Sequence, residues 1–586
     1  MTQTKTILKT DKVKNLAINY QVSLSQPGSH LFEVELNVNN WDKPTLDLKM
    51  PVWSPGSYLI REYAKNVQDF KAKDTQSNQV LNTEKISKNH WLIDTSNSVD
   101  ITISYQVYAH ELSVRTNHLN YSHGYFNGAA LFYYIPGYEQ QAIRVKVIPP
   151  QADWQVTTAL PEVENNVYLA KDFDTLVDSP FEIGTHSLTE FEVLGKKHRL
   201  AIWGEGNLSL EQVIADIQKI IKVEADLYEG LPYEDYLFLL HLSSNGFGGL
   251  EHKNCCSLIY SRFGFRVTEK YQRFLQLVAH EFFHLWNVKR IRPQALETFD
   301  YDQENYTTSL WFAEGATSYY DLLIPVRSGI YDGKTFLGFL SKEISKYLNT
   351  PGRQVQSLSE SSFDAWIKLY RRDANSDNSQ ISYYLKGSLV CLMLDLLIRS
   401  RHQNKRSLDD VMRLMWRRFG QPEIGYSPEE LEEVISTVAE TDLTEFFQLY
   451  LQGTTELPLA EYLALFGLQL QVINKDNVPD LGIQLTDKGV VKFVRQDSVA
   501  AKVGISPGDE ILAINQIRVQ TEEFNERLKD YQEGDKIDLT LFHQDQLRTV
   551  SVELAFPQPS GYEIVPLKEP SQQQRENYQG WLQSEL

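Results

Sequence analysis

Two histidines and a glutamate stand at a spacing that could hold a metal ion and activate water. His280, Glu281 and His284 lie in the apolar stretch FLQLVAHEFFHLWNVK, residues 274–289. On a helix, His280 and His284 would lie about 40° apart, and Glu281 would fall within the same arc of about 100°. Neutral imidazoles bind Zn²⁺, and the carboxylate can accept a proton from a water on the metal. The pattern therefore predicts a zinc site able to catalyse hydrolysis.

Chance is the alternative explanation for this pattern, and a third ligand would argue against it. With 13 histidines among 586 residues, about 0.02 such patterns are expected per chain. Glu314 follows in SLWFAEGATSYYDLLIP, residues 309–325. We predict a second helix here that Pro325 ends, because proline cannot continue a helix. The Glu314 carboxylate could complete a His₂Glu set and leave the fourth position for water.

Several segments carry a resemblance to a known family. HEFFHLWNVKRIRP, residues 280–293, together with WFAEG, residues 311–315, resembles the gluzincin metallopeptidases, and specifically the glycyl aminopeptidase family that has a C-terminal PDZ domain. GGLEH, residues 248–252, resembles the G-x-M-E-N motif of zinc aminopeptidases, and YLKG, residues 384–387, resembles their Y-x-K-G. MPVWSPGSYLIREY, residues 50–63, and YFNGAALF, residues 125–132, resemble the front domain of that family. The similarity covers nearly the whole chain in the family's order.

The resemblance implies a fold and an activity. The fold is multidomain α+β, with an N-terminal all-β domain, a thermolysin-like and mostly α catalytic domain, and a C-terminal PDZ-like α+β domain. One Zn²⁺ per chain would be held by His280, His284 and Glu314, with Glu281 as the base. The expected activity is hydrolysis of the first peptide bond of peptides that have a free N-terminus and a small first residue, glycine or alanine.

The segment around Glu251 is predicted to bind the substrate. Gly248 and Gly249 permit close backbone approach, and an edge strand here could pair with an extended peptide. By the resemblance, Glu251 holds the α-ammonium of the substrate, a charge-assisted contact that sets the cut one residue from the end. An ordinary polar turn residue is the alternative. His252 departs from the family motif, which has asparagine at that position.

Tyr384 is the predicted donor to the oxyanion of the tetrahedral intermediate. It opens the apolar helix expected from SYYLKGSLVCLMLDLLIRS, residues 382–400. The register against Y-x-K-G favours Tyr384, and Tyr383 is the rival. For either residue, the alternative is a core aromatic ring with a satisfied hydroxyl.

The elements around these residues suggest four regions. Residues 1–190 alternate apolar and polar side chains and predict the β-rich N-terminal domain. Residues 191–457 form the predicted metallopeptidase domain, with a buried strand at 236–242, a polar surface loop at 351–380 and a helix whose N-cap is Ser427. Residues 458–556 predict the PDZ-like module, in which SPGDEILAIN, residues 506–515, is the most specific segment. Residues 557–586 form a tail with a short helical or disordered segment.

Composition limits the partners. The net charge is −20, which argues against nucleic acid or an anionic membrane surface as partner. No apolar run of about 18 residues and no signal-like N-terminal segment are evident, and three cysteines cannot form a disulfide framework. We therefore expect a cytoplasmic protein. Its expected partners are peptide substrates and a C-terminal peptide ligand for an open strand edge after Leu481 and Gly482. The alternative for the PDZ-like module is a passive brace against the catalytic domain.

Two other functions use part of the same evidence. An endopeptidase would need the same zinc ligands and base but no amine anchor such as Glu251. A non-catalytic scaffold would bind partners through the PDZ-like module, and a missing zinc ligand would favour it. Because no predicted ligand is missing, the sequence favours an enzyme.

Overall fold

The computed structural model describes residues 16–474 and 478–586 and divides into two compact units. The first unit comprises Met1–Leu208, Tyr233–Arg266 and Phe299–Glu304. The second comprises Ser209–Pro232, Val267–Thr298 and Asn305–Leu586. Each unit is therefore formed by several separate stretches of the chain. The predicted domain boundaries at residues 190, 457 and 556 stay predictions.

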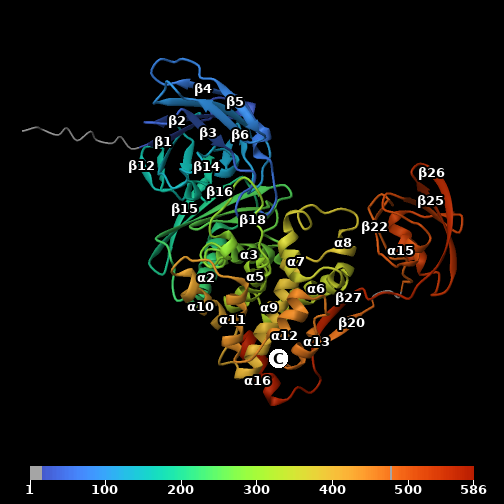
Figure 1. Ribbon diagram of the computed structural model, residues 1–586. Helices are drawn as coiled ribbons and strands as arrows, with labels where there is room; N and C mark the ends of the chain where they lie inside the picture. Colours follow the sequence, from blue (N-terminus) through green and yellow to red (C-terminus); the bar gives the residue numbers. More distant parts are fainter. Residues whose placement is uncertain (1–15, 475–477) are drawn as a thin grey trace, which may run out of the picture. The chain divides into compact units, whose positions relative to one another are not determined.

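The first unit is built from β-sheets (Figure 1). The sheet with seven strands has the order β12 (Glu162–Glu164), β13 (Val167–Ala170), β10 (Ile143–Ile148), β1 (Ala17–Ser23), β2 (Leu31–Asn39), β7 (Ile101–Tyr108) and β4 (Val67–Asp74). Smaller sheets have the orders β3 (Thr45–Lys49), β6 (His90–Asp94), β5 (Thr83–Ser87), and β11 (Gln155–Thr157), β14 (Phe181–Gly184), β9 (His123–Phe126), β8 (His118–Asn120). A short helix, α1 (Phe173–Val177), precedes β14. Alternate residues of β1 and β2 are buried, as the predicted strand pattern requires. The all-β N-terminal domain is confirmed.

A five-stranded sheet completes the first unit. Its order is β15 (Ser187–Val193), β16 (Lys196–Trp203), β17 (Asp235–Ser243), β19 (Cys255–Ser261) and β18 (Phe247–Glu251). β16, β17 and β19 run parallel, whereas β18 pairs antiparallel with β19 at the edge. The predicted buried strand is β17, whose seven inner residues are all buried. Strands covered on both faces favour such continuous apolar runs.

Most helices of the described chain, long and short, lie in the second unit (Figure 1). Their bounds are α2 (Leu210–Leu227), α3 (Thr268–Phe283), α4 (Leu310–Ala313), α5 (Gly315–Arg327), α6 (Gly333–Leu348), α7 (Leu358–Phe363), α8 (Ser376–Ser379), α9 (Tyr383–His402), α10 (Leu408–Met415), α11 (Pro428–Ala439), α12 (Thr444–Phe447) and α13 (Leu459–Ala464). The stretch Ser376–His402 is long and apolar enough to cross a membrane by length and composition, but 83% of its apolar window is buried inside the structure. Its burial is that of a core helix.

Two local predictions in this unit are wrong and one is confirmed. Pro325 lies inside the last turn of α5, which continues to Arg327. The segment 351–380 is not a plain surface loop, because it forms α7, α8 and short 3₁₀ turns that bury Leu358 and Trp366. Polar residues of the segment are buried with them, among them Gln356, whose side chain accepts a hydrogen bond from the Ile381 N–H. The helix start at Ser427 is confirmed, since Ser427 caps α11 with a capping box.

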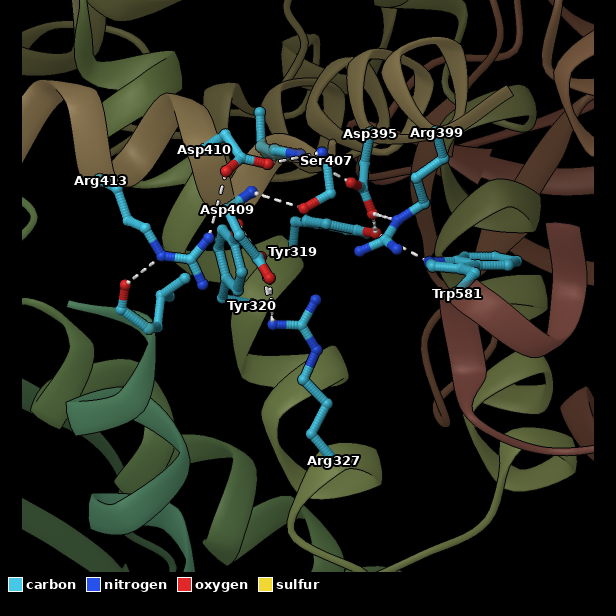
Figure 2. A network of polar contacts seen from close by, with 12 residues as sticks. Tyr319, Tyr320, Arg327, Asp395, Arg399, Ser407, Asp409, Asp410, Arg413 and Trp581 are labelled. Atoms are coloured by element: carbon cyan, nitrogen blue, oxygen red, sulfur yellow. Dashed lines mark hydrogen bonds and ion pairs between the residues drawn. The ribbon is translucent and has the colours of Figure 1, made fainter. Parts of the chain in front are cut away.

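A buried polar network holds α5 against α9, α10 and the C-terminal helix α16 (Gln572–Leu582) (Figure 2). Tyr319 on α5 donates a hydrogen bond of 2.6 Å to Asp395 on α9, and Trp581 on α16 donates one of 3.0 Å to the Tyr319 hydroxyl. Tyr320 donates to Asp409 on α10 at 2.8 Å. Because an unpaired buried polar group is costly, these bonds fix the position of α5. This helix begins directly after the predicted third zinc ligand.

The C-terminal part of the second unit contains the PDZ fold. Its elements are β21 (Ile483–Leu485), β22 (Val491–Val494), α14 (Val499–Lys502), β23 (Glu510–Ile514), β24 (Ile517–Arg518), α15 (Phe524–Leu528), β25 (Lys536–His543) and β26 (Gln546–Glu553). They enclose a hydrophobic core of their own. The tail then returns to the helices: β27 (Gly561–Pro566) pairs with β20 (Leu468–Ile473), and α16 buries Trp581. The predicted tail helix is therefore ordered.

Candidate active site

The last turn of α3 carries the H-E-x-x-H residues. α3 ends at Phe283, and His284 follows as its C-cap with helical dihedral angles of φ −61° and ψ −20°. This keeps the two imidazoles one turn apart, with ring centroids separated by 4.7 Å. Glu281 is buried on the same turn, with 5% of its surface exposed. The local helical geometry inferred from the spacing is therefore present.

Glu314 lies at the junction of α4 and α5 and faces both histidines. Its Oε2 is 3.2 Å from His284 Nε2 and 3.5 Å from His280 Nε2. For metal bonds of about 2.1 Å in a tetrahedral site, neighbouring ligand atoms lie about 3.4 Å apart. The same Oε2 has no hydrogen-bond partner although it is buried. The three side chains therefore fit a zinc ion, and they would supply two nitrogen ligands and one oxygen ligand.

The outer nitrogens of the two histidines are held by residues that the sequence reasoning missed. His280 Nδ1 lies 2.9 Å from Asp321 Oδ2, and His284 Nδ1 lies 2.8 Å from the carbonyl oxygen of Asn287. The Asn287 side chain also donates to the carbonyls of Phe312 and Ala313, directly before Glu314. Such contacts fix the ring orientation of a metal-binding histidine. Asp321 could have been found, because it lies two helical turns after Glu314.

The charges around His280 favour a cation. Burial alone lowers the pKa of His280, but the carboxylates of Asp321 and Glu314 outweigh burial and raise this pKa well above its usual value. Burial raises the pKa of Glu314, yet the two histidines lower it overall. The pKa shifts of both His280 and Glu314 thus favour a positive charge between the imidazoles and the carboxylates. A bound Zn²⁺ would supply that charge.

Tyr384 lies on the first turn of α9 beside the histidines. Its ring stacks near that of His280 with a centroid distance of 6.3 Å, and its hydroxyl lies 3.0 Å from that of Tyr370. Burial and the negative charge of Glu314 raise the pKa of Tyr384 well above its usual value, so the phenol keeps its proton. Tyr383 is fully buried, and its hydroxyl donates a hydrogen bond of 3.3 Å to the Tyr370 hydroxyl. The geometry favours the register that selects Tyr384.

Two glycines explain how the helices that carry Glu314 and Tyr384 approach each other. A Cβ atom on Gly315 would lie 2.6 Å from the Cα of Gly387, and a Cβ on Gly387 would lie 2.6 Å from the carbonyl oxygen of Trp311. Neither position has room for a methyl group. The glycines of the WFAEG and YLKG segments therefore set the spacing between α5 and α9.

Gly248, Gly249 and Glu251 lie on β18 in the first unit, at the free edge of the five-stranded sheet. Gly248 has φ +152°, a conformation that favours glycine. Glu251 is 4% exposed, and its Oε1 has no hydrogen-bond partner. A Cβ on Gly56, in the MPVWSPGSYLIREY segment, would lie 2.5 Å from that oxygen. The Gly56 backbone therefore packs directly against the Glu251 carboxylate.

The fold and this donor set define a zinc metallopeptidase, and the comparisons with known proteins agree. Residues 19–185 match the Peptidase M61 N-terminal domain, residues 273–390 the M61 glycyl aminopeptidase, and residues 479–554 a PDZ domain. The chain belongs to the M61 glycyl aminopeptidase family and is a zinc aminopeptidase with a C-terminal PDZ domain. No curated protein matches the chain.

Solved structures resemble the chain to different degrees. An aminopeptidase N family protein from Idiomarina loihiensis is 32% identical with a TM-score of 0.91, and the alignment covers 96% of this chain and 100% of that one. An M1 zinc metallopeptidase from Deinococcus radiodurans is 12% identical with a TM-score of 0.46, over 76% of this chain and 96% of its own. Yeast LTA4 hydrolase is 11% identical with a TM-score of 0.45, over 76% and 69%. The last two similarities are too weak to support an argument about function.

Proposed function

We propose that this zinc aminopeptidase removes a single small residue, glycine or alanine, from peptides with a free N-terminus. The observation that carries the proposal is the buried Glu251 carboxylate, whose Oε1 has no hydrogen-bond partner. A buried carboxylate without a partner is costly, and the α-ammonium of a peptide would offset that cost with a charge-assisted bond. The preference for a small first residue follows from the family, and the Gly56 backbone supports the amine anchor by packing directly against the same carboxylate.

Each residue of the metal centre has a role in this proposal. His280, His284 and Glu314 would hold Zn²⁺, which when bound supplies the Lewis acidity that lowers the pKa of water toward neutrality. Glu281 accepts the proton of the attacking water and later returns it to the leaving amine. Tyr384 donates a hydrogen bond to the oxygen of the substrate carbonyl as negative charge develops there. Asp321 and the Asn287 carbonyl keep the two imidazoles in their orientation.

The Tyr384 hydroxyl gives the first testable result. We expect Tyr384→Phe to lower kcat by about 10²-fold to 10³-fold, with a smaller change in KM, because the lost bond forms chiefly in the transition state. Tyr383→Phe is the matched control on the same helical turn and should retain nearly full activity. A loss in Tyr383→Phe without one in Tyr384→Phe would move the donor by one residue.

Substrate choice tests the proposal as a whole. Glycyl and alanyl peptides should be cleaved with a kcat/KM at least about tenfold above that of leucyl and phenylalanyl peptides, since a closed pocket rejects added methylene groups. N-acetylated versions of the same peptides should resist cleavage, and a chelator should abolish it for all of them. Equal cleavage of internal bonds in acetylated peptides would instead favour an endopeptidase.

We further propose a ligand for the PDZ domain and a cellular location. Within the described residues β21 pairs only with β22, so its other edge is open to the C-terminal strand of a peptide. A cytoplasmic location is supported by the cysteines: within the described residues, Cys255, Cys256 and Cys391 are buried and form no disulfide. Binding of C-terminal peptides with a free and with an amidated carboxylate tests the first proposal.

A further inference from the structure

A second cluster of histidines lies in the first unit, apart from the residues of the predicted active site. Across residues 16–474 and 478–586, two groups of three His and Glu side chains are close enough to share a metal ion. One is the His280, His284 and Glu314 group. The other is His123, Glu182 and His241, whose ligand atoms lie within 4.8 Å of one another and which are all buried. The proposed peptide hydrolysis does not use the side chains of this second group.

These side chains come from separate strands of two sheets. His123 is on β9 and Glu182 on β14, which pair in the four-stranded sheet, whereas His241 is on β17 in the five-stranded sheet. The exposed fractions are 0% for His123, 1% for Glu182 and 0% for His241. A contact among these three side chains therefore joins the four-stranded sheet to the five-stranded sheet.

The Glu182 carboxylate lies between the two imidazoles. His241 Nε2 is 2.8 Å from Oε2, and His123 Nε2 is 2.7 Å from Oε1. The second contact is not aligned as a hydrogen bond, and neither His123 Nε2 nor Glu182 Oε1 has a hydrogen-bond partner. A carboxylate this deeply buried needs positive charge nearby. Two nitrogen atoms and two oxygen atoms thus face a small space where a cation would satisfy all of them.

The surrounding residues have the features of the outer layer of a metal site. His123 Nδ1 lies 2.8 Å from His118 Nδ1, which fixes the ring so that Nε2 faces Glu182. His186 borders the group without belonging to it: its Nδ1 lies 3.9 Å from Glu182 Oε1, and its Nε2 lies 2.8 Å from Thr157 Oγ1. The Trp203 ring stacks on His123 at 4.0 Å and contributes to the closed environment.

We propose that His123, Glu182 and His241 form a second Zn²⁺ site whose role is structural. Imidazole and carboxylate ligands suit Zn²⁺, and all three side chains are buried, so the site has no opening for a substrate. The separations of 2.7 and 2.8 Å would widen to about 3.4 Å around a tetrahedral ion with bonds of about 2.1 Å. The metal would join β9 and β14 to β17.

Zinc content of the full chain is the first test. The double variant His284→Gln/Glu314→Gln removes two ligands of the catalytic centre and leaves the second cluster unchanged. After dialysis against metal-free buffer, we expect two zinc equivalents in the unmodified chain and one in the double variant. One equivalent in the unmodified chain and none in the folded double variant would overturn the proposal.

A third substitution locates the remaining metal. Glu182→Gln, added to the double variant, keeps the side-chain size but removes the charge, and it should abolish the remaining zinc equivalent. His198→Gln is the matched control: His198 is also fully buried in the first unit, but its Nε2 lies 2.7 Å from the Tyr233 hydroxyl, outside the cluster. This control should keep the zinc. Equal zinc retention in the Glu182 and His198 variants would refute the site.

Cobalt substitution provides a readout that does not depend on the Glu182 variant folding. The double variant loaded with Co²⁺ should show the visible absorption of a four-coordinate ion with nitrogen and oxygen ligands. Addition of zinc should remove this band by displacement. Should the folded double variant bind neither zinc nor cobalt in this geometry, the proposed site does not exist, whatever the behaviour of Glu182→Gln.

Discussion

Glu281→Gln should retain its zinc and lose activity by about 10²-fold to 10⁴-fold, the range that positioned general bases contribute. Glutamine has nearly the shape of glutamate, so the turn of α3 and the ligands on either side of it should keep their positions. The amide cannot accept the proton of the attacking water at neutral pH. Steady-state kinetics with a glycyl substrate, together with zinc content on the same sample, measure both parts of this expectation.

The control for this variant lies on the same helix. Glu269 is in the first turn of α3, exposed and paired with Lys342, so Glu269→Gln makes the same chemical change at the other end of α3. It should leave kcat and zinc content unchanged. Loss of zinc in Glu281→Gln would show that this residue supports the metal site rather than acting as base, and near wild-type turnover would mean that another group is the base.

The parts of the active site that the sequence predicted are those encoded over a few residues. His280, Glu281 and His284 share one helical turn, so their spacing alone specifies their geometry. Asp321 was missed because its contact with His280 depends on how α3 packs against α5, and the Asn287 carbonyl was missed because the turn of backbone after α3 brings it to His284. The histidine cluster had no sequence signal at all. Its members lie on different strands, with Glu182 and His241 separated by 59 residues.

The fold shows the same division between local and tertiary causes. The alternation of apolar and polar residues was enough to predict the strands of the first unit, whose burial alternates in the same way. The Ser-Pro-Glu-Glu segment was enough to predict the start of α11, because it forms a capping box. The prediction of a surface loop at 351–380 is wrong because it rested on the polar composition of the segment, whereas the structure buries polar residues such as Ser361 and Ser376 together with Leu358 and Trp366. Pro325 was read as a helix end, although the last turn of a helix can include proline when the rest of the helix is held by packing.

Glu251→Gln should reduce kcat/KM for glycyl and alanyl substrates by about 30-fold to 5,000-fold, corresponding to the 2 to 5 kcal/mol lost when one partner of a buried charge pair is removed. An α-ammonium that leaves water requires a negative partner, and the neutral amide cannot supply the charge. N-acetylated substrates have no ammonium group, so their already slow cleavage should change far less. A similar loss on acetylated and free peptides would show that Glu251 has no specific role in amine binding.

Gly56 allows the position of the Glu251 carboxylate to be tested without changing its charge. A methyl group at Gly56 would lie 2.5 Å from Glu251 Oε1, so Gly56→Ala should displace the carboxylate and lower kcat/KM for free-amine substrates in the same way as Glu251→Gln. Gly56 has φ +83°, and alanine there also carries backbone strain.

Gly137→Ala is the matched control, because Gly137 has φ +82° but no atom within 4 Å of its added Cβ. The thermal unfolding temperature should fall in both variants through backbone strain, and further in Gly56→Ala through the contact with Glu251. Selectivity for free over acetylated peptides should fall only in Gly56→Ala, and an equal fall in Gly137→Ala would attribute the effect to strain rather than to the displaced carboxylate.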